Sequence, residues 1–226
     1  MKRILFVRHG QSEINLRMAA VVGGQSNSSP LTPLGEQQAA CLGRHLRRHL
    51  QPHASPALAA SSTAVRARDT ARLALAAVDP PLPPGLELEE DEALLELDQG
   101  EWEGAPRADC YTPAALASIA ADPWRFAAPG GESQADLEAR VAAYVETRLL
   151  PRLAVGGPPA VVFSHGLAIK CFLRGVLGSE AGMTWKIRLD NTGLVSLGWV
   201  EAGPAAGWHL LRVNDTGHLD AEGVQY

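Results

Sequence analysis

Residues 2–10, KRILFVRHG, decide the fold, because four consecutive apolar residues run directly into an arginine and a histidine. An uninterrupted apolar run is typical of a strand that is buried on both faces of a parallel sheet. Residues 160–166, AVVFSHG, repeat this layout and lead into an apolar helical stretch that extends to Leu177. Gly10 and Gly166 permit a tight turn after each histidine and let the backbone approach a ligand closely. Both segments are therefore predicted to be strands that end in a His-Gly pair.

The rest of the chain alternates further strands with helices. Helices are predicted over residues 33–50, 65–78 and 133–150, and strands over residues 57–61, 193–200 and 208–213, with partial strand character over residues 87–97. This alternation predicts an α/β fold, a three-layer sandwich with a mostly parallel central sheet flanked by helices. We expect residues 1–226 to form a single catalytic domain, with residues 101–132 as a short insertion or lid over the site.

The composition is that of an ordinary globular protein with no excess of positive charge. The chain has 226 residues, 46% hydrophobic residues and a net charge of -5. Binding to a phosphate backbone needs an excess of Lys and Arg, so no nucleic-acid partner is expected. No apolar run approaches the roughly 20 residues of a membrane span, and no membrane partner is expected. Three unclustered cysteines favour a reducing compartment over a disulfide framework, and we expect a cytoplasmic enzyme. The oligomeric state is left open.

Four basic or ionisable side chains are expected to meet at one edge of the predicted sheet. Ligand sites in open α/β sheets lie beyond the carboxyl ends of the strands. His9 and His165 lie at two such ends, and Arg8 directly precedes His9. Arg66 lies near the start of the helix that follows the strand at residues 57–61, where a helix N-terminus also favours an anion. The sequence therefore predicts an electropositive pocket for an anion in an otherwise acidic protein.

Five short sequence blocks resemble, in their order along the chain, motifs of the histidine phosphatase superfamily. The resemblance is to the branch that contains the cofactor-dependent phosphoglycerate mutases and their phosphatase relatives. The blocks are RHG at residues 8–10, RAxxTA at 66–71, LxExxxGxWEG at 94–104, GGES at 130–133 and SHG at 164–166. A weaker similarity is DNTGLVSL at residues 190–197. The resemblance implies a phosphoglycerate mutase-like fold and an enzyme that acts on a small phosphorylated metabolite. No cofactor is expected.

The resemblance also implies roles for the reacting residues. His9 is expected to attack phosphorus and become phosphohistidine, with its other ring nitrogen donating to a backbone carbonyl that fixes the tautomer. Glu96 matches the acidic residue of the family, which protonates the leaving oxygen and then activates the water that cleaves the phosphoenzyme. The phosphoryl group is expected to be held by Arg8, Asn15, Arg66, His165 and Gly166.

No metal is expected in this chemistry, since two arginines and a histidine can supply the positive charge that the phosphoryl oxygens need. His45 and His49 have the i, i+4 spacing of a metal-binding pair on a helix. No Glu or Cys near them completes a metal site, and three arginines surround them. They are therefore interpreted as part of a solvated basic face.

The sequence leaves three functions open, namely a phosphatase, a phosphomutase and a non-catalytic module. The region 101–132 is much shorter than the matching region of true mutases, which favours a phosphatase over a phosphomutase. A non-catalytic module that binds a phosphorylated ligand is the third hypothesis. The loop 17–29 departs from the common form of the family, so contacts from Gln25 or Ser26 stay open. The aromatic residues Trp102, Trp124 and Phe126 fit either a substrate pocket or packing within the lid.

Overall fold

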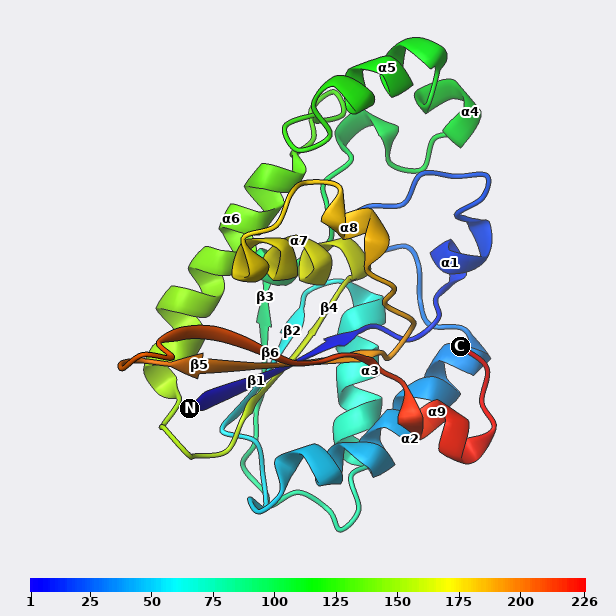
Figure 1. Ribbon diagram of the computed structural model, residues 1–226. Helices are drawn as coiled ribbons and strands as arrows, with labels where there is room; N and C mark the ends of the chain where they lie inside the picture. The colour runs from blue at the N-terminus through cyan, green and yellow to red at the C-terminus, as the bar shows by residue number, and fades with distance from the viewer.

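The computed structural model describes residues 1–226 and contains one six-stranded sheet in the order β3-β2-β4-β1-β5-β6 (Figure 1). The first four strands in this order run parallel, whereas β5 is antiparallel to β1 and β6 is antiparallel to β5. The strands are β1 (Lys2–Arg8), β2 (Leu58–Ser62), β3 (Leu88–Asp91), β4 (Ala160–Ser164), β5 (Leu194–Val200) and β6 (Gly207–Asp215). The predicted α/β fold with a mostly parallel sheet is confirmed.

Helices cover both faces of the sheet, which explains why β1 is apolar throughout. The helices α2 (Pro33–Leu50) and α3 (Val65–Ala76) lie on one face, and α6 (Gln134–Tyr144) and α7 (Gly166–Leu177) on the other (Figure 1). Side chains alternate between the faces of a strand. Ile4 and Phe6 accordingly join the core beneath α6 and α7, while Leu5 and Val7 join the core beneath α2 and α3.

Helix α2 begins where the sequence predicts. The Thr32 hydroxyl accepts a 3.1 Å hydrogen bond from the backbone N–H of Gly35, and Pro33 occupies the first helical position. The predicted helix over 133–150 is α-helical only to Tyr144. It continues as a π-helical turn (Val145–Leu149) and a 3₁₀ turn (Leu150–Arg152). Periodicity alone does not distinguish such turns from a regular helix.

The remaining elements are short. Two 3₁₀ turns (Glu92–Leu94 and Gly100–Trp102) follow β3, so strand structure covers only part of the predicted 87–97 segment. The other helices are α1 (Glu13–Arg17), α4 (Arg107–Cys110), α5 (Pro113–Ala121), α8 (Met183–Lys186) and α9 (Gly217–Glu222). The segment with α4 and α5 projects beyond the sheet at the top of Figure 1. None of the helices combines the length and the hydropathy that crossing a bilayer requires.

Candidate active site

His9 lies directly after β1 and is almost fully buried, with 4% of its surface exposed. Its Nδ1 is 2.7 Å from the carbonyl oxygen of Gly10. A carbonyl can only accept, so Nδ1 carries the proton and Nε2 keeps its lone pair. Burial lowers the pKa of His9 well below its ordinary value, and the positive charges of Arg66 and Arg8 lower it further. The ring is therefore neutral, with a free Nε2, at neutral pH.

His165 follows β4 at the same edge of the sheet and is fully buried. The centroids of its ring and the His9 ring are 5.2 Å apart. Its Nε2 is 2.8 Å from the hydroxyl oxygen of Ser62, and that oxygen already accepts the N–H of Ala64. The Ser62 hydroxyl hydrogen has no other acceptor, so the hydroxyl is assigned as donor to Nε2, which leaves the His165 proton on Nδ1. That buried N–H has no acceptor within the protein.

Two arginines lie beside the histidine pair. Arg66, in the first turn of α3, is 3% exposed and donates to the carbonyl oxygens of Ser26 (2.9 Å) and Gly24 (2.7 Å). Arg8 ends β1 and donates to the carbonyl oxygen of Leu189 at 2.6 Å. The Nε atoms of both guanidinium groups are buried and have no acceptor within the protein.

These side chains form what we call the cation nest, defined as Arg8, His9, Arg66 and His165. Three of its buried nitrogens, Nε of Arg8, Nε of Arg66 and Nδ1 of His165, lack an acceptor. A buried donor without a partner is costly, and an anion with several oxygens satisfies such donors together. The nest is therefore suited to a tetrahedral oxyanion placed next to Nε2 of His9.

Glu96 reaches the nest from the loop that follows β3. Its Oε1 accepts the N–H groups of Ala168 (3.0 Å) and Leu97 (2.9 Å), and its Oε2 accepts the N–H of Leu167 (3.1 Å). Two of these donors belong to the first turn of α7, where free N–H groups and the helix dipole favour a carboxylate. The carboxyl group is thus held on the helix that starts directly after His165.

Asn15 lies beside the nest but makes no hydrogen bond to its arginines. Its Oδ1 accepts the N–H of Ser12 at 2.9 Å, within the N-terminal cap of α1. The same oxygen is 3.4 Å from Nδ2 of Asn191, which donates to the carbonyl oxygen of His9 at 2.9 Å. Asn191 is a site residue that the sequence reasoning missed. Its signal in the sequence is the weak similarity to the family at DNTG, residues 190–193.

The two glycines of the His-Gly pairs serve different purposes. A Cβ on Gly10 would lie 2.6 Å from the carbonyl oxygen of Gly35, at the start of α2. The backbone at Gly10 thus lies close to the backbone of Gly35, whereas the sequence led us to expect a close approach to a ligand. A Cβ on Gly166 would lie 3.4 Å from Nε of Arg8, so Gly166 borders the nest.

Thr192 holds the backbone of the nest from the turn before β5. Its N–H donates to the carbonyl oxygens of Arg8 (3.0 Å) and His9 (3.3 Å). Its φ of 55° is in the left-handed region, which a β-branched residue rarely adopts. Such a conformation costs on the order of 1–3 kcal/mol and persists where the surrounding structure enforces it.

The loop 17–29 covers the nest and is tied down by Glu103. The Glu103 carboxylate accepts the N–H groups of Gln25 (2.5 Å) and Ser26 (3.0 Å). The Gln25 side chain donates to the carbonyl oxygen of Glu96 at 3.0 Å. Arg66 and Glu103 both line a cavity of about 280 Å³ beneath this loop. The loop thus contacts Glu103, Arg66 and Glu96, of which Glu103 and Arg66 line the cavity.

Two of the three aromatic residues line a small cavity that Leu97, the neighbour of Glu96, also lines. The cavity measures about 90 Å³, and its lining includes Leu97, Trp102, Phe126 and Leu167. Trp124 does not line this cavity. Its ring packs against Arg174, whose Cζ lies 3.9 Å from the ring centroid. Trp102 and Phe126 thus line this cavity and also pack against each other, with ring centroids 5.7 Å apart, whereas Trp124 packs against Arg174.

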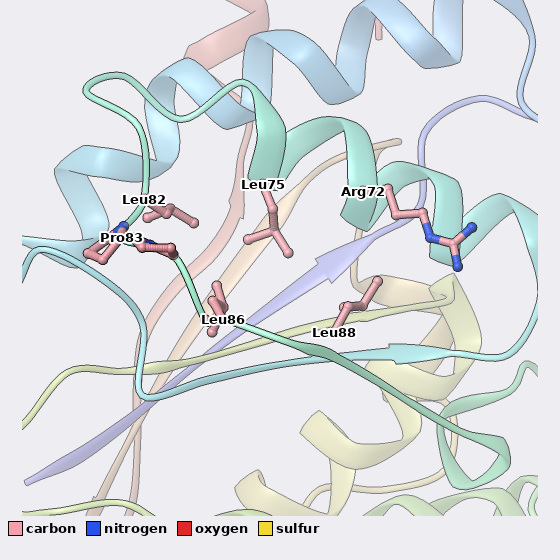
Figure 2. Close-up of a pocket in the computed structure, with 8 residues that line it drawn as sticks. Arg72, Leu75, Leu82, Pro83, Leu86 and Leu88 are labelled. Atoms are coloured by element: carbon pink, nitrogen blue, oxygen red, sulfur yellow. The ribbon is translucent and has the colours of Figure 1, made fainter.

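A larger hollow lies elsewhere and contains no member of the nest. Figure 2 shows this apolar hollow, of about 320 Å³, between α3 and the proline-rich loop that precedes β3. It is lined by Arg72, Leu75, Leu82, Pro83, Pro84, Gly85, Leu86 and Leu88. Its one charged lining residue, Arg72, is exposed and paired with Glu90, so the hollow offers no set of converging groups for an anion.

The interpretation of His45 and His49 as a solvated face is wrong. Each side chain is only 12% exposed, and both face the carboxylate of Asp215 at the end of β6. No pattern in the sequence indicates this partner, because Asp215 lies far along the chain and reaches α2 only through the fold.

The chain matches a known family over nearly its whole length. Residues 4–216 match the family described as histidine phosphatase superfamily (branch 1). The probable phosphoglycerate mutase GpmB of Yersinia pestis is 32% identical, over 97% of this chain and 96% of that protein.

Solved structures with a similar fold include two phosphatases. A mycobacterial glucosyl-3-phosphoglycerate phosphatase is similar with a TM-score of 0.73 and 28% identity, over 94% of this chain and 98% of that chain. Phosphoserine phosphatase from Entamoeba histolytica, solved with 3-phosphoglyceric acid, is similar with a TM-score of 0.75 and 25% identity, over 97% of this chain and 100% of that chain.

Proposed function

The chain belongs to the histidine phosphatase superfamily, branch 1, and from this premise we propose that it hydrolyses phosphate monoesters of a small metabolite through a phosphohistidine on His9. The observation that carries the proposal is the state of the His9 ring. Its Nδ1 is bound to the Gly10 carbonyl, so Nε2 has a lone pair, and it lies among buried N–H donors that lack acceptors. A nucleophile and a set of oxyanion donors thus share one pocket.

In the first step, Nε2 of His9 attacks phosphorus and the bond from phosphorus to the ester oxygen breaks. Arg8, Arg66 and His165 donate to the phosphoryl oxygens and stabilise the charge that they carry in the transition state. Glu96 gives a proton to the leaving oxygen, so the product leaves as an alcohol; the carboxyl group must take up this proton before the step, against the preference of the α7 N–H groups for the carboxylate. The enzyme is left with phosphohistidine at His9 and a carboxylate at Glu96.

In the second step, water attacks phosphorus and the bond from phosphorus to Nε2 breaks. Glu96 takes a proton from this water and returns to its starting form, while inorganic phosphate is released. The Glu96 carboxyl is bound to the N–H groups of α7, the helix that begins after His165, so the acid and the phosphate-binding imidazole keep a fixed relation in both steps.

The substrate is proposed to be a small phosphorylated metabolite whose leaving group faces the cavity near Trp102 and Phe126. This cavity includes Leu97 and Leu167, the neighbours of Glu96 and Gly166. The segment 101–132 would then act as a lid over the leaving group. The similar proteins are named for reactions of phosphoglycerate derivatives and phosphoserine, which are small and acidic. The mechanism needs no metal, and EDTA is expected to leave the rate unchanged.

A phosphomutase is the second candidate, because the relative at 32% identity is named a probable phosphoglycerate mutase. A mutase must return the phosphoryl group to the bound molecule before water enters. It would exchange phosphate between positions of its substrate and be stimulated by a bisphosphorylated primer. Phosphate release without either behaviour would identify a phosphatase.

The proposal is tested by measuring phosphate release from p-nitrophenyl phosphate and from a panel of phosphorylated metabolites. His9→Ala is expected to lower kcat by at least about 10³-fold, because the nucleophile is removed. A ³²P-labelled ester should leave an alkali-stable label on the wild-type protein and none on the variant. His209→Ala is the control, since His209 lies on β6 and bonds only to the carbonyl of Ala205. An unchanged rate in His9→Ala would refute the proposed nucleophile.

A further inference from the structure

A second group of histidines lies outside the cation nest, where α2 meets the C-terminal end of the chain. His45 and His49 lie on successive turns of α2, and Asp215 ends β6 just before α9. Figure 1 shows α9 packed beside α2, which brings these residues together. One nitrogen from each histidine and one oxygen of Asp215 all lie within 4.8 Å of one another. None of the three residues takes part in the proposed reaction.

The separations within this group are those of metal ligands and exceed those of hydrogen bonds. Nε2 of His45 is 3.9 Å from Oδ1 of Asp215, and Nε2 of His49 is 3.5 Å from Oδ2. Direct N–H···O bonds measure about 2.7–3.2 Å. Ligand atoms at the corners of a tetrahedron around Zn²⁺, with bonds of about 2.0–2.1 Å, are roughly 3.4 Å apart. A small cation fits between these atoms with little movement of the side chains.

A buried nitrogen in the group has no hydrogen bond. Nε2 of His49 is inaccessible to water and lacks a hydrogen-bond partner, although the side chain faces a carboxylate. Imidazole nitrogen and carboxylate oxygen are together a frequent ligand set for zinc. A bound cation would satisfy the His49 nitrogen and both Asp215 oxygens at once.

The ligands are held by a surrounding layer of contacts, as metal ligands usually are. Oδ1 of Asp215 accepts the N–H of Gly217 at 3.1 Å, which fixes the carboxylate. Arg212 lies 3.3 Å from Oδ2 of Asp215, but its side chain is 65% exposed and can turn into water when a cation binds.

His218 lies against the same group. Its ring centroid is 5.6 Å from that of His45. Its Nε2 is 2.8 Å from the Thr192 hydroxyl, which itself donates to the Asn191 carbonyl, so Nε2 is assigned as the donor. The lone pair on Nδ1 of His218 is then buried and without a partner. The fourth position around the cation is left for water or for this nitrogen.

We infer that His45, His49 and Asp215 form a binding site for a divalent cation of the zinc class, which ties α2 to the corner between β6 and α9. The site is structural and separate from the cation nest. Because its ligands come from segments far apart in the sequence, bound metal stabilises the folded chain and not the unfolded one.

The inference is tested on tag-free full-length protein that has been treated with EDTA. Titration with Zn²⁺, followed by calorimetry, is expected to give one site per chain and to raise Tm. Co²⁺ is expected to give the strong visible absorption of a tetrahedral site. His49→Ala and Asp215→Asn are expected to bind Zn²⁺ at least about 100-fold more weakly. His53→Ala, which removes a histidine beyond the end of α2, is the control and should bind as the wild type does.

Asp215→Asn keeps the oxygen that accepts the Gly217 N–H, so a folded variant is available if His49→Ala is unstable. Circular dichroism and the rate of ester hydrolysis verify its fold. The metal-free and Zn²⁺-loaded wild type should hydrolyse the ester with the same kcat. Absence of Zn²⁺ binding at 100-fold molar excess would overturn the inference, as would unchanged binding in both ligand variants.

Discussion

The protein contains two groups of buried histidines that differ in their neighbours. In the cation nest, His9 and His165 lie among arginines, and no carboxylate bonds to either ring. In the second group, His45 and His49 face Asp215. Opposite charges attract most strongly where water is excluded. The positive charge around the first pair of histidines therefore favours an anion, and the negative charge beside the second pair favours a cation.

The comparison shows that the charge next to a histidine decides its chemistry more than its burial does. Burial lowers the pKa of histidines in both groups, so the rings are neutral in both. In the proposed reaction, the neutral His9 ring attacks phosphorus and His165 donates to a phosphoryl oxygen, beside the two arginines. The carboxylate instead supplies the negative charge that a metal ion needs. Three predictions, from the largest expected effect to the smallest, test this contrast.

The largest effect is expected at Arg66. Arg66→Ala should lower kcat/KM for ester hydrolysis by about 10²–10³-fold, because one buried donor to the phosphoryl group is lost. Inhibition by inorganic phosphate should weaken in parallel, while Zn²⁺ binding should be unchanged. Arg68→Ala is the matched control on the same helix, since Arg68 pairs with surface carboxylates. Equal rates in the two variants would remove Arg66 from the proposed site.

Acid is expected to lower the free energy of unfolding by on the order of 3 kcal/mol or less for each buried histidine. Burial lowers the pKa of His49 and of His218 from 6.5 to about 4. The unfolded chain therefore takes up these protons first, and stability is lost as the pH falls from about 6.5 to about 4. Urea unfolding of metal-free protein at pH 7 and pH 4.5 measures the loss.

Substitution separates the contributions of the two groups to this acid sensitivity. The nest contributes in the same direction, because burial also lowers the pKa of His9 and of His165. His49→Gln should make the loss of stability between the two pH values smaller, and His165→Gln should do the same from the other group. A pH dependence identical to wild type in both variants would contradict the assignment of buried neutral rings.

The smallest effect is expected at Glu103, which anchors the loop over the nest. Glu103→Gln replaces one accepting oxygen with a donor that faces an N–H, so one of the bonds to Gln25 and Ser26 is lost. We expect KM to rise by about tenfold with little change in kcat. Glu101→Gln is the control, being an exposed neighbour. A fall in kcat with unchanged KM would place Glu103 in the reaction and not in the positioning of the loop.

Much of the fold and of the nest was readable from short contiguous patterns. The apolar runs before Arg8 and His165 identified strands, and the ends of parallel strands meet at one edge of a sheet. Helix α2 was predicted from Thr32 and Pro33, which mark its start by a local mechanism. Glu96 is indicated only by the resemblance to the family, because in its own stretch of sequence it is one acidic residue among several.

The features that were missed depend on contacts between distant segments. Asp215 is an ordinary acidic residue until the fold carries it to His45 and His49. Asn191 and Glu103 likewise act through backbone groups of other segments, for which no periodic pattern exists. The helices α1, α8 and α9 are too short for hydrophobic periodicity to reveal them.

Thr192 gives the two histidine groups a common neighbour. Its amide is bonded to the backbone at His9, and its hydroxyl meets His218 beside the proposed metal ligands. A shift of the α9 corner therefore has a route of two hydrogen bonds to the peptide that carries the nucleophile. Because this corner is already in place without metal, loading with Zn²⁺ leaves the alignment of the attacking atom unchanged, whereas loss of the C-terminal segment would disturb it.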